Sequence, residues 1–370
     1  MRPATRAVRA AALGLVLVAV AVLLAACTPT GGPPPQPTPP GTARPAPSPS
    51  PSRPTATFTV WHWNVAGGSG YGISPQAGDA MGAGRVRTVV NSISSPAQGN
   101  DLASVNEMCL SQYQAVRRGL AERGWPHDPG GSFSRWTELD GSGSRCGGEP
   151  VGNAIFSRYP LAPGAEVFRL PAAPAGSPDA ATDPYARSLT CVTPRPYPSV
   201  RFCVTHITFL ASSAAYGKQA QLDDVRETLD RYVRAGVTPI VAGDFNTGAN
   251  FRELDGWYTP EAGRRTATRA DGSRVATNPG NTGHYVELGD DDATGCRGYG
   301  QGTSDTYRDN GPCGTGVRID LVFVPADRVR GEYWSSTYGP ESVNCTLAEV
   351  PRAPACSDHR VVRGRVTLAL

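Results

Sequence analysis

The sequence lacks any large excess of charge of one sign. Its 35 lysine and arginine residues are set against 32 aspartate and glutamate residues, which gives a formal net charge of +3. Arg2, Arg6 and Arg9 account for this excess, and they lie in a segment that we expect to be removed. Bulk charge therefore does not indicate a strongly basic nucleic-acid binder, and any site for a polyanion has to be local.

The sequence also lacks the cysteine and histidine spacings that zinc sites need, with no CxxC pair and no histidine cluster. Nine cysteines are present, and eight remain when Cys27 is set aside. An even number of cysteines in an exported chain indicates disulfides, although the sequence leaves many pairings open. We predict that neighbouring cysteines pair: Cys109–Cys146, Cys191–Cys203, Cys296–Cys313 and Cys345–Cys356. The best supported pair is Cys191–Cys203, because these two residues lie in predicted strands on either side of the turn "PRPYPS".

The first 55 residues indicate export rather than a packed fold. A basic start precedes an unbroken apolar run from Ala10 to Ala26, and "LLAAC" ends at Cys27. This pattern predicts a signal peptide over 1–26 and resembles the bacterial lipoprotein cleavage box, with Cys27 as the lipidated first residue. The alternative is an uncleaved transmembrane anchor, for which the run is at the short limit. Residues 27–55 are rich in proline and predict a semi-rigid spacer, so we expect a lipid-anchored or extracellular protein.

Residues 56–370 mix short apolar strands with amphipathic helices and predict one α/β domain. The segment "TFTVWHWNV" alternates as a strand does, with two tryptophans on one face and His62, interpreted as structural, on the other. The clearest helix is "KQAQLDDVRETLDRYV", which carries an apolar stripe. Residues 248–316 are weakly patterned, and we expect long loops there.

Polar side chains recur where apolar strands meet loops: Asn64, Glu107, His206, Asp244, Asn246, Asp320, Asp358 and His359. Carboxylates such as Glu107 and Asp358 are hard oxygen ligands that suit Mg²⁺. An imidazole such as His359, oriented by the Asp320 carboxylate, can transfer protons near neutral pH. A metal with an acid/base histidine suits the attack of water on phosphorus.

The motifs "WNV", "VNE", "GNAIFSRYP", "VTH", "AGDFN", "RIDLVFV" and "SDH", in this order, resemble the endonuclease/exonuclease/phosphatase superfamily. That group contains DNase I, abasic-site endonucleases, bacterial sphingomyelinases and inositol-polyphosphate phosphatases, and the resemblance spans residues 58–368. It implies a DNase I-like four-layer α/β sandwich, with two central sheets flanked by helices and the site at one end. It also implies a hydrolase of phosphoester bonds that uses Mg²⁺, with Mn²⁺ or Ca²⁺ as alternatives.

The resemblance assigns a role to each strand-end residue. Glu107 is the main metal carboxylate, and Asn64 and Asp358 complete the metal environment. Asp244 and Asn246 position water, metal and phosphate. His359 with Asp320 matches the catalytic pair, and His206 matches the histidine that steadies the phosphate. Whether His359 or Asp244 takes the proton from water stays open, as does the family's further site residue between Glu107 and Gly152.

The expected substrate is a nucleic acid, DNA or RNA, cleaved by a monomeric phosphodiesterase. Arg264 and Arg265, in "GRRTATRADGSR", are candidates for binding substrate phosphates. A phospholipid phosphodiesterase or a phosphoinositide-type phosphatase with the same core chemistry is the alternative. A surface binding protein without catalysis is a further alternative, and the complete set of strand-end residues disfavours it.

Overall fold

The computed structural model describes twelve ranges of the chain, and several predictions fall outside them. Cys27, Arg264, Arg265 and the pairs Cys296–Cys313 and Cys345–Cys356 lie outside the described residues. Residues Ser52–Leu370 group into one compact unit. No helix in the described part is long and apolar enough to span a membrane. The described residues are 53–67, 80–128, 131–139, 146–210, 215–248, 251–261, 266–268, 274–276, 280–290, 300–304, 317–338 and 357–370.

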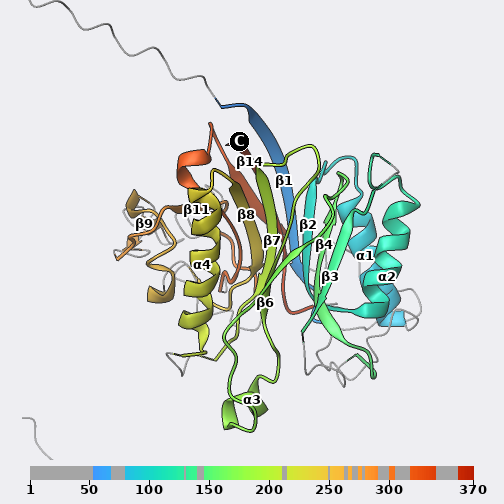
Figure 1. The fold of residues 1–370 in the computed structure, drawn as a ribbon, viewed down its shortest axis with the longest axis horizontal. Helices are drawn as coiled ribbons and strands as arrows, with labels where there is room; N and C mark the ends of the chain where they lie inside the picture. The colour runs from blue at the N-terminus through green and yellow to red at the C-terminus, as the bar shows by residue number, and fades with distance from the viewer. Residues whose placement is uncertain are drawn as a thin grey trace, which may run out of the picture. The chain divides into compact units, whose positions relative to one another are not determined.

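Two six-stranded mixed sheets pack face to face in the fold (Figure 1). Spatial order in the first sheet is β13 (Trp334–Tyr338), β14 (Val361–Ala369), β1 (Thr55–Asn64), β2 (Leu102–Cys109), β4 (Val151–Ser157) and β3 (Ser134–Glu138). Spatial order in the second is β11 (Tyr285–Glu287), β12 (Asp320–Pro325), β8 (Thr238–Asp244), β7 (Val200–His206), β6 (Ser188–Val192) and β5 (Glu166–Arg169). A separate two-stranded sheet pairs β9 (Thr266–Thr268) with β10 (Arg274–Ala276).

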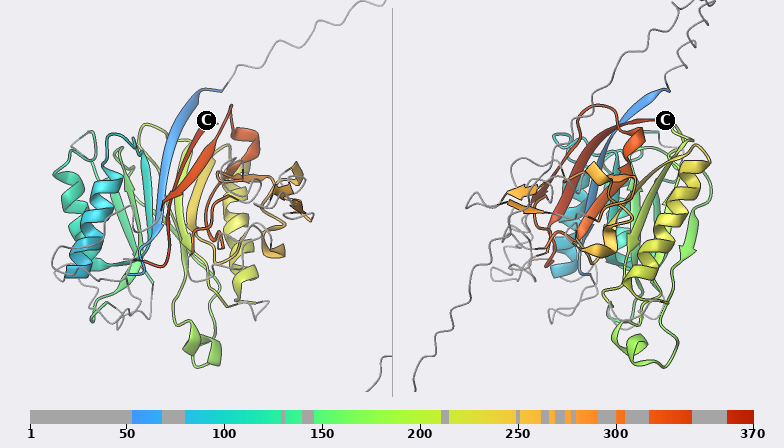
Figure 2. Two further views of the ribbon diagram at one scale, coloured as in Figure 1. Left: turned by 180° about the vertical axis from the view of Figure 1, so that it is seen from behind. Right: turned by 90° about the vertical axis from the view of Figure 1, so that its left-hand side faces the viewer.

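Helices cover the outer faces of the two sheets, as both views of Figure 2 show. On the first sheet lie α1 (Ala80–Ile93) and α2 (Leu110–Ala121), and on the second lies α4 (Lys218–Arg234). The short helices are α3 (Pro178–Thr182), η1 (Arg252–Leu254) and η2 (Ala326–Arg328). Three apolar clusters fill the helix–sheet, sheet–sheet and sheet–helix spaces, so the predicted four-layer sandwich is confirmed.

Strand β1 shows why the sequence forms this layered core. Its alternate residues point to opposite faces of the sheet. Phe58 and Val60 pack between the two sheets, whereas Trp61 and Trp63 pack against the helices, and all four are completely buried. A strand buried on both faces has to be apolar on both, which leaves the polar residues for its ends.

Two of the predicted disulfides are present. Cys191 and Cys203 are directly opposite each other on the antiparallel strands β6 and β7, as the hairpin prediction required. The Cys109–Cys146 bond fastens the end of β2 to the segment before β4. The prediction of long loops over 248–316 is partly wrong, because η1, β9, β10 and β11 lie there and β11 extends the second sheet. These strands have only three residues each, too few for a clear alternating pattern.

The topology brings many strand ends to one edge of the sandwich. Strands β1 and β2 are parallel neighbours in one sheet, and β7 and β8 are parallel neighbours in the other. Their carboxyl ends therefore lie at the same end of each sheet. The antiparallel strands β12 and β14 begin at that end, next to β8 and β1 respectively.

Candidate functional site

The predicted residues from both sheets meet at this edge. Asn64 ends β1, Glu107 lies near the end of β2, and His206 and Asp244 end β7 and β8. Asp320 starts β12, and His359 lies just before β14. His206 and Asp320 are the direct neighbours of Asp244 in the strand register. Side chains that are up to 295 positions apart in the sequence thus converge through strand pairing alone.

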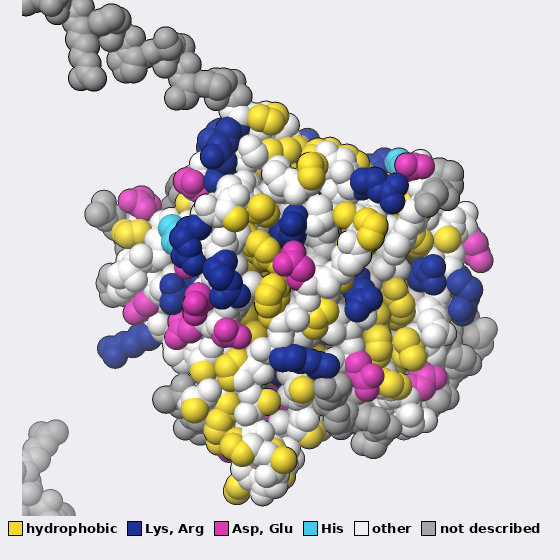
Figure 3. Space-filling model, in the orientation of Figure 1, with side chains coloured by type: hydrophobic (Ala, Val, Ile, Leu, Met, Phe, Trp, Pro, Cys, Tyr) yellow, Lys and Arg dark blue, Asp and Glu magenta, His cyan; other side chains and the backbone are white. Residues whose placement is uncertain are grey.

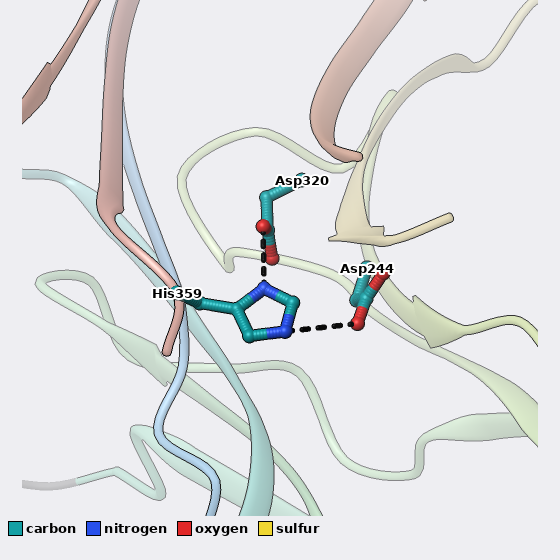
Figure 4. A group of neighbouring side chains, drawn as sticks. All are labelled: Asp244, Asp320 and His359. Atoms are coloured by element: carbon teal, nitrogen blue, oxygen red, sulfur yellow. Dashed lines mark hydrogen bonds and ion pairs between the residues drawn. The ribbon is translucent and has the colours of Figure 1, made fainter. Parts of the chain in front are cut away.

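His359 is held on one side by Asp320 and faces Asp244 on the other (Figure 4). Its Nδ1 lies 2.7 Å from Asp320 Oδ2, and its Nε2 lies 3.7 Å from Asp244 Oδ2. The backbone is fixed as well, since the Trp63 indole donates to the His359 carbonyl and Ser357 Oγ accepts from the His359 amide. The ring is therefore positioned before any substrate binds.

Asp244 is the most highly connected carboxylate of the site. Its Oδ2 accepts a 3.0 Å hydrogen bond from Asn64 Nδ2 and lies 3.5 Å from His206 Nε2. Its Oδ1 accepts from the amide of Asn246, and its own amide donates to Asn106 Oδ1. Only 2% of Asp244 is exposed. A side chain held by both sheets has little freedom, which suits a group that must orient a reacting atom.

Glu107 reaches the site through an irregularity in β2. The register between β2 and β4 shifts between Val105 and Met108, and Glu107 has a φ of 56°. Its Oε1 lies 3.4 Å from Asn64 Nδ2 and 3.9 Å from His206 Nε2. The side chain is 27% exposed, compared with 3% for Asp244 and 0% for Asp320. The bulge thus turns one carboxylate toward solvent at the mouth of the site.

Backbone strain gathers at the same place. The described residues other than glycine include three with a positive φ, namely Ala66, Glu107 and Asn246. All three directly follow or belong to the predicted site strands. Such a conformation costs about 1–3 kcal/mol each and is kept where function requires it. This clustering is a second, independent indication that the edge is a functional site.

The motif "GDFN" has a packing reason for its glycine and its asparagine. A Cβ on Gly243 would lie 2.1 Å from the Thr205 carbonyl oxygen of β7, so only glycine allows the two strands to pair there. Asn246 Nδ2 donates to the Ile207 carbonyl at 2.8 Å. Lys218, the only lysine of the chain, donates from Nζ to the Asn246 carbonyl. The loops after β7 and β8 are therefore fastened to each other.

The charges of the buried groups depend on one another. Burial, with the nearby Asp320 charge, raises the pKa of Asp244 to about 7, against the opposing effect of His359. Burial also disfavours a charged Asp320, yet His359 and His62 hold the pKa of Asp320 below its ordinary value. Burial opposes the charge of His359 too, but Asp320 and Asp244 raise the pKa of His359 well above 6.5. The pKa of His206 is lowered by burial and by Arg187. Asp320 and Asp244 thus favour the charged form of His359, whereas burial favours the neutral form of His206.

Asp244, Asp320 and His359 form a group that could hold a divalent ion. One ligand atom from each lies within 4.8 Å of the others, and all three residues are buried. Two of the three groups are already joined by the His359–Asp320 hydrogen bond. Glu107 contributes a more accessible carboxylate 3.4 Å from Asn64. Asp358 is partly exposed next to His359, and its charge contributes to raising the pKa of His359.

Several contributors were missed by the sequence reasoning. His62, interpreted as structural, lies on the expected face of β1, and its Nε2 is 3.3 Å from Asp320 Oδ1, so it contacts the carboxylate that holds His359. Asn106 fixes the Asp244 amide, and Thr303 Oγ1 accepts from the Asp320 amide. Two signals were available in the sequence. Asn106 directly precedes Glu107 in "VNE", and His62 lies two positions before Asn64, on the same face of β1. Thr303, in a weakly patterned region, gave none.

Comparison with known proteins identifies the relatives of this chain. The model of the "Endonuclease/Exonuclease/phosphatase family" matches residues 61–359. No curated protein matches. Among solved structures, a Bacteroides thetaiotaomicron endonuclease/exonuclease/phosphatase family protein has 15% identity and a TM-score of 0.51, over 86% of this chain and 100% of that one. A mannosyl-6-phosphatase of the same organism has 16% identity and a TM-score of 0.51, over 85% and 100%. D. rerio TDP2, complexed with a single-strand DNA product, has 15% identity and a TM-score of 0.48, over 85% and 100%.

Proposed function

The chain belongs to the endonuclease/exonuclease/phosphatase family, and on that premise we propose that it is an exported, divalent-metal-dependent phosphodiesterase that hydrolyses nucleic acids. Family membership makes it a hydrolase of phosphoester bonds. We propose in addition that it uses a divalent metal, that it acts on nucleic acids outside the cytoplasm, and that the strand-end residues have the roles given below. The observation that carries the proposal is the His359 ring held between two carboxylates at the convergence of four parallel-strand ends.

The His359–Asp244 pair handles the proton of the attacking water. Asp320 accepts from His359 Nδ1, so Nε2 is the ring atom that faces the site. Nε2 and Asp244 Oδ2 lie 3.7 Å apart, beyond a direct hydrogen bond, so both can contact the same oxygen of a water or a phosphate. Fixing a histidine with a buried carboxylate sets its tautomer and its orientation.

Glu107 is the main carboxylate for the metal, with Asn64 and Asp358 completing its surroundings. These residues supply hard oxygen ligands, as Mg²⁺ prefers, and the exposure of Glu107 leaves room for metal-bound waters. Mn²⁺ or Ca²⁺ could take the same place. Bound there, the cation offsets negative charge on the phosphoryl oxygens. Asn64, Asn246 and His206 bring donors to those oxygens without adding negative charge to the site.

Exposed aromatic residues near the site favour a nucleic-acid substrate over a lipid. Phe209 follows His206 by three positions and is 48% exposed, and Phe251 follows Asn246 by five and is 39% exposed. Hydrogen bonds from Asn246 and Lys218 fasten the two loops that carry them. Separate aromatic rings provide stacking surfaces for bases. A lipid enzyme needs a continuous apolar surface, whereas the exposed large apolar residues of the described part of the chain are four: Val167, Phe209, Phe251 and Trp334.

The protein is proposed to act outside the cytoplasm as a monomer, anchored through lipid on Cys27. The two disulfides support an oxidising location, because cytoplasmic thiols are kept reduced. The predicted signal over 1–26 and the spacer over 27–55 supply the route and the tether. Arg264 and Arg265 remain proposed phosphate contacts. Labelling of the expressed protein with a radioactive fatty acid, lost in Cys27→Ala, tests the anchor.

A substrate panel tests the function. Purified protein is assayed with single-stranded DNA, duplex DNA, RNA, sphingomyelin, a phosphoinositide and a sugar phosphate, each with Mg²⁺ and with EDTA. The proposal expects Mg²⁺-dependent cleavage of nucleic acid at the highest kcat/KM of the panel. Faster turnover of either lipid would instead support the phospholipid alternative, and no turnover of any member would contradict the proposed enzyme.

A further inference from the structure

We propose that a pocket at the opposite end of the first sheet binds a phosphate-bearing anion. The pocket has a volume of about 390 Å³, and three of its lining residues are Arg158, Arg363 and Arg365. A neighbouring pocket of about 250 Å³ shares Arg158 with it and adds Arg123 and His127. Four arginines therefore line two adjacent pockets that no part of the proposed reaction uses.

The pocket is separate from the catalytic edge. Thr57 and Thr59 line it at the start of β1, whereas Asn64 at the end of β1 belongs to the catalytic edge. A strand rises about 3.3 Å per residue, so Thr57 and Asn64 are roughly 23 Å apart along β1. A ligand in the pocket does not touch the catalytic residues, and substitutions in the pocket should leave hydrolysis of a small substrate unchanged.

Strand geometry brings two of the arginines together. Arg363 and Arg365 are two positions apart on β14, so their side chains emerge on the same face of the sheet. Further along β1, Trp61 lies opposite Arg363 on that face and packs against the helices. Toward the start of β1, residues 96–99 rather than a helix line the pocket on this face. Arg363 is fixed there, since its Nε donates to Asn100 Oδ1 and its guanidinium lies 5.1 Å from the Trp334 ring centre.

The pocket has a local excess of positive charge. Of the lining residues that the structure describes, Asp101 is the one carboxylate: it accepts from the Thr59 amide and the Tyr159 hydroxyl, and its Oδ1 lies 3.9 Å from Arg158 Nη1. One carboxylate therefore faces four guanidinium groups, and Arg123, Arg363 and Arg365 have no carboxylate partner among the lining residues. On the face of the molecule drawn in Figure 3, acidic and basic side chains are interspersed. Like charges held together repel one another, so four arginines in a nearly neutral chain indicate an anionic ligand.

A phosphate group is the chemical class that fits. Guanidinium groups bind phosphate oxygens with two parallel hydrogen bonds, and arginine is the preferred residue for that geometry. The phosphate could come from a lipid headgroup or from a soluble compound. The described chain enters the fold at this end, through Arg53 and Pro54 before β1 (Figure 1). Anionic lipid headgroups attract clusters of arginine residues near a membrane surface.

Binding experiments with the full chain test the proposal. The probes are inorganic pyrophosphate by calorimetry in EDTA, and sedimentation with vesicles of phosphatidylcholine alone or with phosphatidylglycerol. The variant is Arg158→Gln with Arg365→Gln. The matched control is Arg117→Gln with Arg87→Gln, two exposed arginines on α2 and α1 that remove the same charge elsewhere. Thermal unfolding and hydrolysis of a small chromogenic phosphodiester report whether each variant is folded and active.

We expect the pocket variant to weaken binding of one probe by about tenfold or more, while the control leaves it unchanged. If the pocket variant binds pyrophosphate more weakly than the wild type, the pocket binds soluble phosphates. If only its binding to phosphatidylglycerol vesicles is weaker, the pocket binds lipid headgroups. Either result supports the proposal. Equal binding by the wild type, the pocket variant and the control, or no binding of either probe at 0.15 M salt, would overturn it.

Discussion

The Nδ1 atom of His359 lies 2.7 Å from the Oδ2 atom of Asp320, although His359 precedes β14 of the first sheet and Asp320 begins β12 of the second. Asp320 is completely buried and also contacts His62, so it cannot move away from the ring. The pairing joins β12 to the segment before β14 and directs the other nitrogen of His359 toward Asp244. The arrangement of the two sheets therefore determines the orientation of the proposed proton-transfer group.

Replacing Asp320 with asparagine should lower kcat about 10²- to 10⁴-fold with little change in KM. The carboxamide keeps the shape but loses the charge that orients and supports the His359 imidazole. Steady-state kinetics on a chromogenic phosphodiester measure the effect. Asp327→Asn, at an aspartate whose side chain is 68% exposed in η2, is the matched control and should keep full activity. Equal kcat for the two variants would argue against the catalytic pair.

Glu107→Gln should raise the Mg²⁺ concentration needed for half-maximal activity by about tenfold or more. The substitution removes one negative charge from the proposed metal ligand and preserves its size. Thermal unfolding with increasing Mg²⁺ supplies a second readout, because a ligand stabilises the state that binds it. Glu138→Gln, at an exposed glutamate on β3, is the control. If Glu107→Gln left the Mg²⁺ dependence of activity and of unfolding unchanged, Glu107 would not be a ligand of the metal.

In EDTA, Asp244→Asn should become more stable relative to the wild type as pH rises from 5 to 8. The pKa of Asp244 is about 7 in the fold and 3.8 in the reference state. A raised pKa means that stability is full below pH 3.8 and is lost as pH rises through 7, because ionising the buried carboxyl costs free energy. Asparagine never ionises, so the difference should grow by about 2–3 kcal/mol over this range. Denaturant unfolding at each pH measures it, and a difference that stays constant would contradict the raised pKa.

The two disulfides should differ in their effect on the site. Replacing Cys109 and Cys146 with serine removes a closure of 37 residues, worth about 4 kcal/mol, and frees the bulge that holds Glu107. Replacing Cys191 and Cys203 removes a closure of 12 residues, worth about 3 kcal/mol, in a hairpin. Both variants should unfold at lower temperature, but only the first should also need more Mg²⁺. If both variants needed the same Mg²⁺ concentration, the Cys109–Cys146 disulfide would not be what positions Glu107.

The layers of the fold and most of the site could be predicted because they depend on local patterns. Strand β8 is apolar from Pro239 to Gly243 and ends in Asp244, and β1 is mainly apolar from Phe58 to Trp63 and ends in Asn64. A polar residue at such a position indicates a sheet edge rather than a core. The Cys191–Cys203 pairing followed from one hairpin. Each of these signals lies within about ten residues of sequence.

Contacts between distant segments could not be predicted in the same way. His62 contacts Asp320 only because the two sheets stack, and nothing near position 62 specifies which residue will face it. The positive φ of Glu107 results from a bulge set by pairing with β4. The short strands β9, β10 and β11 have too few residues for a periodic pattern. These features depend on tertiary packing, which overrides local preference.

The most direct test compares the wild type with His359→Ala in Mg²⁺-dependent hydrolysis of bis(4-nitrophenyl) phosphate. His284→Ala, at a histidine whose side chain is 51% exposed and bonded to Asp230, is the control. We expect activity in the wild type and the control, loss of that activity in EDTA, and a decrease of about 10²-fold or more in His359→Ala without loss of folding. Activity in His359→Ala equal to that of the wild type would contradict this expectation.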